Sequence, residues 1–235
     1  MDVTNNSGIK TLEELASEDC CILFDTSVIT PLGKGKEFFD SKTIKEKADF
    51  KEENSNFLHE LVRHIANKGN FFVTGCVLEE IGNRRNYDYK KTIRREGACK
   101  DRELLRLRRL IKRGEQEQRR VLNAFIDNDK VVVLEGEMKK LYEKISEKYQ
   151  MFIGKYSLSH ADFDFLLTGI TLAMASIPII FVSNDYKIFY ARDDILEDEN
   201  IKEKDVSFLT RVDFFKFRPL FYHKHPKIEQ LLGGS

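Results

Sequence analysis

Acidic side chains occur where apolar runs end and where predicted helices begin, in four separate parts of the chain. Burying a carboxylate costs free energy unless a cation or hydrogen-bond donors contact it. Acids at the ends of apolar runs are therefore expected to have such partners. In a parallel α/β sheet, ligands bind beyond the carboxyl ends of the strands, and all of these acids would meet at that edge. They are Asp25 after CILF, Glu79 and Glu80 after FFVTGCVL, Asp162 and Asp164 after YSLSHA, and Asp185 after IIFVSN.

Taken one at a time, these acids have simpler explanations. Asp25 and Asp185 could each cap a turn at a strand end, and Asp162 could interact with a helix dipole. Taken together, clustered carboxylates repel one another and raise each other's pKa unless a cation lies among them. Oxygen ligands without a His or Cys set favour Mg²⁺ or Mn²⁺ over zinc. Such a site leaves room for water and a phosphate oxygen, so the pattern predicts phosphodiester hydrolysis.

Short apolar runs suited to strands buried on both faces alternate with longer helical stretches. This alternation predicts an α/β fold with a mostly parallel central sheet covered by helices on both faces. The predicted strands are residues 21–25, 71–74, 130–134, 179–183 and 206–209. The predicted helices are residues 54–68, 76–83, 100–126, 136–149, 159–175 and 212–218.

The chain of 235 residues fits one domain, 1–235, with its core in residues 20–215. Two insertions are predicted in it: a polar one at about 30–53, and a basic helical one at about 84–127 in which Leu104, Leu107 and Ile111 share a helical face. The 39 basic and 39 acidic side chains of the chain cancel, yet residues 84–120 hold fifteen Lys and Arg against six Asp and Glu. The sequence therefore predicts a basic segment on an acidic body.

Four motifs resemble those of the PIN-domain nuclease superfamily, which includes the VapC-like ribonucleases. ILFDTSVI resembles the opening strand of that family, and VTGCVLEEI resembles its second motif, which selects Glu80 over Glu79. LSHADFDFLLTGITLA and IPIIFVSND resemble the third and fourth motifs, and the fourth ends on Asp185. Within the third motif, the spacing to later small residues favours Asp164, whereas the pattern LSxxD favours Asp162.

The resemblance implies a three-layer α/β/α fold and an endoribonuclease that hydrolyses RNA with water activated by one or two Mg²⁺ or Mn²⁺ ions. In that scheme Asp25 and Asp185 hold the metal, one of Asp162 and Asp164 completes the set, and Glu80 orients the attacking water. Thr26 and Ser183 would hydrogen-bond the carboxylates or the phosphate. Single-stranded DNA is an alternative substrate. An antitoxin or other protein partner and a homo-oligomer are compatible with the resemblance, although this chain is longer than the compact toxins.

Basic side chains follow the predicted helix that carries Glu80, so they could extend from the rim of the site and hold an RNA backbone. Only Tyr87 and Tyr89 accompany them as aromatic side chains, which favours recognition of backbone or shape over stacking on single-stranded bases. The basic side chains are Arg84, Arg85, Lys90, Lys91, Arg94 and Arg95.

Two other functions compete with this one. A non-catalytic PIN-like module would keep the acids and bind RNA or protein. A phosphatase of the haloacid-dehalogenase type also ends its first strand with Asp, but it needs a second Asp two residues later, where this chain has Ser27. The complete acidic set favours the nuclease over both.

The N-terminus lacks the basic start and apolar stretch of a signal peptide, and the four cysteines show no metal-binding spacing. Both features predict a cytoplasmic protein with free thiols. Residues 165–184 carry no charge over nearly the length of a membrane span, but Pro178 interrupts them. A helix, a turn and a buried strand are expected there, and no membrane association.

Overall fold

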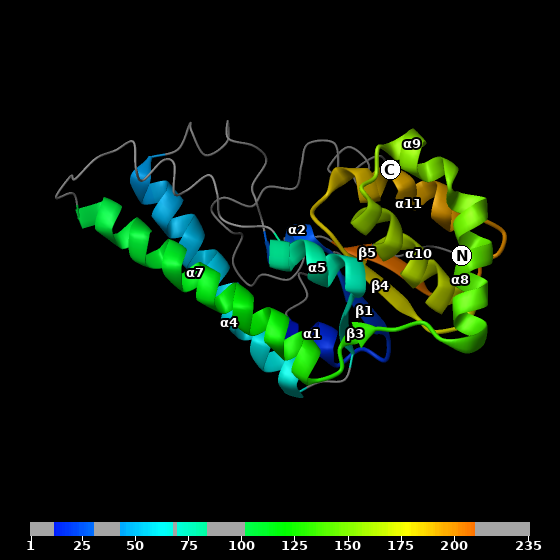
Figure 1. Ribbon diagram of the computed structural model, residues 1–235, viewed down its shortest axis with the longest axis horizontal. Helices are drawn as coiled ribbons and strands as arrows, with labels where there is room; N and C mark the ends of the chain where they lie inside the picture. The colour runs from blue at the N-terminus through cyan, green and yellow to red at the C-terminus, as the bar shows by residue number, and fades with distance from the viewer. Residues whose placement is uncertain (1–11, 31–42, 68–69, 84–101, 210–235) are drawn as a thin grey trace.

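The computed structural model describes residues 12–30, 43–67, 70–83 and 102–209, and a five-stranded sheet lies at its centre (Figure 1). The strand order is β3-β2-β1-β4-β5, and all four pairings among the described residues are parallel. The predicted α/β class with a parallel sheet is confirmed, and the arrangement is consistent with three α/β/α layers. The strands are β1 Cys21–Phe24, β2 Phe71–Thr74, β3 Val131–Val132, β4 Ile179–Val182 and β5 Val206–Leu209.

Each predicted strand is present, although β3 is reduced to two residues at the edge of the sheet. Residues of β4 are buried throughout, and three of the four in β1 are buried, as expected for strands covered on both faces. The side chain of Phe24 packs edge to face on that of Phe71, with ring centroids 5.2 Å apart. The centre of the sheet therefore forms the core predicted from the apolar runs.

Helices connect the strands, and five of the six predicted helices are present; the sixth, 212–218, lies outside the described residues. Within the described residues, the short helices α1, α2 and α9 and the twelve-residue helix α11 were not predicted. The helices are α1 Leu12–Ala16, α2 Thr26–Ile29, α4 Ile44–Asn67, α5 Gly75–Asn83, α7 Arg102–Asp127, α8 Gly136–Tyr149, α9 Met151–Tyr156, α10 His160–Met174 and α11 Tyr186–Glu197.

The segment predicted as a polar insertion at about 30–53, a loop or loose helix, overlaps the first turns of a long helix. Helix α4 begins at Ile44 and not near residue 54, and residues 31–42 lie outside the described part of the chain. Ala48 and Phe50 are buried. Ala48 packs on another helix, and this tertiary contact is not apparent from the polar composition of the segment.

That partner is α7, which runs beside α4 in the same direction, and together they extend away from the sheet (Figure 1). Arg106 of α7 pairs with Asp49 and Glu52 of α4, and further along Arg113 donates to the side chain of Asn56. Between the helices lies a small apolar core of Ala48, Leu107, Leu110 and Ile111. The apolar face predicted for this basic helix is confirmed.

Gly169 lets α10 approach the sheet closely. A Cβ atom there would lie 2.2 Å from the ring of Phe181, which is fully buried and packed between Phe165 and Phe208. Gly169→Ala is therefore expected to destabilise the fold by about 2 kcal/mol in chemical denaturation, because overpacking outweighs the helix propensity that Ala gains. The control is Gly154→Ala in α9, where nothing lies within 4 Å and stability should stay equal or rise. Equal stability of Gly169→Ala and the wild type would contradict the close packing.

The uncharged stretch 165–184 divides as expected into the end of α10, a turn and β4. None of the helices in the described residues is both long and apolar enough to cross a membrane.

Candidate functional site

The strand order reverses between β1 and β4, because the chain adds β2 and β3 on one side of β1 and β4 and β5 on the other. Ligand sites of open α/β sheets lie beyond the carboxyl ends of the strands at such a point. Asp25 follows β1 directly, and its backbone N–H donates to the carbonyl of Val182 at the end of β4, at 2.9 Å. Asp185 follows β4 by three residues. Two of the predicted site residues therefore lie where the topology favours a ligand.

Both acids begin a helix. The Asp25 carboxylate accepts from the backbone N–H of Ser27 at 3.2 Å and caps α2. The Asp185 carboxylate accepts from the backbone N–H of Lys187 at 2.9 Å and caps α11. Both acids therefore do act as caps, and each carboxylate is stabilised by the helix N-terminus that it caps. Capping fixes where the carboxylates lie and does not exclude a further role.

Hydroxyl groups hold the Asp25 carboxylate in place. Ser27 Oγ donates to Asp25 Oδ2 at 2.5 Å, and Ser183 Oγ donates to the same oxygen at 2.8 Å. Ser27 Oγ in turn accepts from the backbone N–H of Asn184 at 2.8 Å, which ties the segment after β1 to the segment after β4. In the described part of the chain, every hydrogen bond to this carboxylate reaches Oδ2, so Oδ1 is left for another ligand.

Asp25 is 2% exposed, and its electrostatic surroundings are unfavourable for a charge. Burial raises the pKa of its carboxyl from 3.8 to about 7, and the negative charges of Asp162 and Asp185 contribute to the increase, while the hydrogen bonds from Ser27 and Ser183 oppose it. Two carboxylates from distant parts of the sequence thus act on Asp25. A bound cation would relieve the repulsion that they exert on its charge.

Asp162 and Asp164 have different surroundings. Asp162 is buried and forms a capping box with Ser159, in which each side chain accepts from the other residue's backbone N–H. Its charge acts on Asp25. The Asp164 carboxylate accepts instead from the hydroxyl of Tyr142 on α8, at 2.8 Å. Of the two alternatives in the third motif, Asp162 is the one whose charge raises the pKa of Asp25.

Glu80 joins the site through a neighbour of Asp25. Thr26 Oγ1 donates to Glu80 Oε2 at 2.6 Å across 54 residues of sequence, and Thr26 is almost fully buried. This contact links α5 to the start of α2. Thr26 and Ser183, predicted to bind carboxylates or phosphate, both donate to carboxylates of the site.

Beside this cluster lies a second group of polar side chains that the sequence did not reveal. The Cys76 Sγ atom is 3.8 Å from His160 Nε2, at the point where α5 meets α10. Burial and, next in size, the charge of the adjacent Asp164 raise the pKa of the Cys76 thiol to about 11. A thiol held protonated in this way is a poor nucleophile.

The acids can be tested for their fit to a metal ion. Within the described residues, no three His, Cys, Asp or Glu side chains already form a compact ligand set. Mg²⁺ does not require one, because it keeps several waters and is commonly held by one or two carboxylates and a substrate phosphate. The oxygen-only donors and the repulsion centred on Asp25 fit such an ion. They do not form the all-protein cage of a structural zinc or calcium site.

Compared with family models, curated proteins and solved structures, the chain matches none of them. The motifs and the site geometry are therefore the basis for a function.

The sequence missed three polar partners of the site: Ser27, Asn184 and Tyr142. A signal existed for the first, because Ser two residues after a strand-end Asp is typical of a capping turn. No local pattern could pair Asn184 with Ser27, or Tyr142 with Asp164, since each contact depends on tertiary structure. The six basic side chains predicted to bind RNA, between Arg84 and Arg95, lie outside the described residues.

Proposed function

We propose that the protein is a metal-dependent endoribonuclease with a PIN-like fold. The observation that carries the proposal is the buried Asp25 at the topological switch point, with Asp162 and Asp185 close enough to raise its pKa. The four motifs support the same conclusion. Asp25 and Asp185 would hold Mg²⁺ or Mn²⁺, with Asp162 as the third acid.

When bound, the divalent cation would supply charge neutralisation at the phosphate and acidify a water molecule. The residues of the chain have complementary tasks. Ser27 and Ser183 fix the Asp25 carboxylate, and Thr26 fixes Glu80 so that its carboxylate can orient water and accept a proton. Hydrolysis that takes place in one step by water needs no side-chain nucleophile, and would leave a 5′-phosphate and a 3′-hydroxyl.

The test is an incubation of the purified protein with end-labelled RNA in Mg²⁺, in Mn²⁺ and in excess EDTA. We expect cleavage with either metal, loss of cleavage by about 10³-fold or more in EDTA, and recovery when the metal is restored. Incubation with single-stranded DNA of the same sequence shows whether cleavage requires ribose. Cleavage that continues in EDTA, or products with a 2′,3′-cyclic phosphate, would contradict the proposal.

A non-catalytic binding module is the second candidate, and the lack of a compact three-ligand set among the described residues favours it. The two candidates differ in metal binding. A nuclease should bind Mn²⁺ in calorimetry and cleave RNA, whereas a binding module should bind RNA equally well with Mn²⁺ or EDTA and release no product.

A further inference from the structure

We propose that the exposed face of α7 is a binding surface for the phosphate backbone of double-stranded RNA, an inference that rests on the proposed ribonuclease function for the identity of the ligand. Four basic side chains define this surface, called the α7 stripe: Arg102, Arg109, Lys112 and Arg119. All four are exposed. Their spacing of seven, three and seven residues places them on one helical face over about 25 Å, at 1.5 Å per residue.

The cations of the α7 stripe differ from their neighbours on the helix in their surroundings. Within the described residues, none of its four members makes an ion pair, whereas the neighbouring cations of α7 are engaged: Arg106 pairs with Asp49 and Glu52, and Arg120 with Glu117. Leu105 and Gln116 lie between the stripe members on this face and bring no negative charge. Asp127, an exposed acid, lies about two turns beyond Arg119 at the end of the helix.

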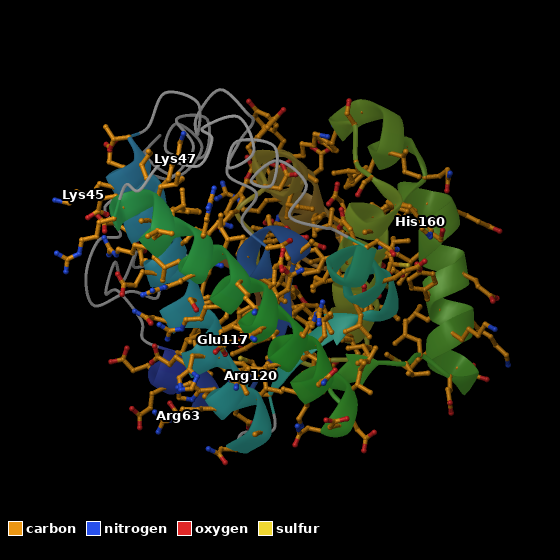
Figure 2. The ribbon with its side chains drawn as sticks, turned by 60° about the vertical axis from the view of Figure 1, so that its left-hand side comes forward. Lys45, Lys47, Arg63, Glu117, Arg120 and His160 are labelled. Carbon is orange, nitrogen blue, oxygen red and sulfur yellow. The ribbon has the colours of Figure 1, made fainter. Side chains whose placement is uncertain are left out.

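The acids in the body of α7 point elsewhere. Glu103 contacts Arg106, Glu115 acts on the buried Lys51 of α4, and Glu117 is buried beside His59 of α4. In Figure 2, Glu117 and Arg120 mark the middle of the pair and Lys45 and Lys47 its outer end. Before its last turn, the helix thus engages its acids with α4 or with its own cations and leaves a positive outer face. An anionic ligand fits that face.

Several features favour duplex RNA over other anionic ligands. A membrane-binding helix needs a free apolar face, but the apolar face of α7 is buried against α4, and Leu105 is the one large apolar side chain on the stripe. Binding of single strands relies on aromatic side chains that stack on bases, and the stripe has none. A straight row of mostly guanidinium groups suits phosphates recognised by shape.

Helix α7, which carries the stripe, contacts the helix that carries Glu80. Gln118 Nε2 donates to the carbonyl of Ile81 at 2.9 Å, and Ile81 directly follows Glu80 on α5. Arg119, at the inner end of the stripe, is the next residue along α7. RNA held on the stripe would therefore lead toward the helix that carries Glu80.

The experiment measures binding of a 20-base-pair RNA duplex by the Asp25→Asn protein, so that cleavage does not interfere, over a series of salt concentrations. The double variant Arg109→Gln/Lys112→Gln should weaken binding by about 10-fold or more, and should reduce the slope of log K against log salt by about 2. The matched control is Lys139→Gln/Lys144→Gln, which removes the same charge from exposed positions of α8. Far-ultraviolet circular dichroism checks that each variant is folded.

An equal loss of duplex affinity in the stripe and control variants would show that only net charge matters, and would overturn the inference. Unchanged affinity in the stripe variant, or no binding of duplex by the Asp25→Asn protein, would overturn it as well. Polyglutamate bound as tightly as the duplex would indicate an acidic protein as the ligand, and single-stranded RNA bound more tightly would also contradict it. The two proposals fail separately. Duplex binding through the stripe without metal-dependent cleavage by the wild type would leave the inference intact and remove the nuclease.

Discussion

Replacing Asp25 by Asn is expected to lower the rate of RNA cleavage by about 10³-fold and, at the same time, to stabilise the metal-free protein at neutral pH. The loss follows from the removal of the negative charge at the centre of the acidic cluster. The gain follows from the same position, because the wild-type carboxylate is buried beside two other acids. The neutral amide retains an oxygen that can cap α2 and accept from Ser27.

The sign of the stability effect follows from the pKa of Asp25, which burial, Asp162 and Asp185 raise from 3.8 to about 7. Because the folded protein holds this proton more tightly than the unfolded chain, stability due to Asp25 is present in full below pH 4. It is lost as the pH rises from about 4 to about 7. Above that range the free energy of unfolding of the wild type is about 1–4 kcal/mol lower than that of the Asn variant.

Urea denaturation of both proteins in EDTA, at several pH values from 4 to 8, measures this difference. The two free energies of unfolding should be similar near pH 4 and diverge toward pH 8, with the variant more stable. Asp127→Asn, at an exposed end of α7, is the control and should change neither property. Addition of Mn²⁺ should stabilise the wild type and leave Asp25→Asn unaffected. A variant that is less stable than the wild type at pH 8 would show that Asp25 is held by favourable contacts and not strained by its neighbours.

The sequence predicted most of the sheet because its signals are local. CILF, FFVT and IIFV are short apolar runs, and each becomes a strand within one residue of the predicted bounds. The end of the first strand placed Asp25, and the end of the fourth placed Asp185. Elements that depend on tertiary contacts could not be predicted as well. The first turns of α4 are the clearest case, since the residues of α7 that pack on Ala48 lie about 60 residues later in the chain.

In the candidate site, too, the features with local signals could be predicted and those that depend on tertiary contacts could not. Local patterns identified the acids, and the capping pattern LSxxD identified Asp162 as the start of α10, which the structure bears out as a capping box. Local patterns could not decide between Asp162 and Asp164, because the two lie two residues apart on one helix and their surroundings come from other elements. Tyr142 on α8 engages Asp164, whereas the segment after β1 brings Asp25 near Asp162.

The choice between these two acids gives the second prediction with a large effect. Asp162→Asn should lower the cleavage rate by about 10²-fold or more and weaken Mn²⁺ binding, because it removes a charge that acts directly on Asp25. Asp164→Asn should change the rate by less than about 10-fold, since its carboxylate accepts from Tyr142 and an amide oxygen can do the same. The two variants form a matched pair, with the same substitution on the same helix.

Folding must be separated from catalysis in this comparison, because Asp162 also caps α10 through Ser159. An Asn at position 162 can keep the bond from the backbone N–H of Ser159, so we expect a loss of stability of at most about 1 kcal/mol, measured by urea denaturation. A rate loss of about 10²-fold in a variant that remains folded then reports on the metal site. The reverse ranking, with Asp164→Asn inactive and Asp162→Asn active, would place the third acid on the side of α10 that faces Tyr142. The Asp25 cluster would then be a capping arrangement that accumulates charge without binding the catalytic ion.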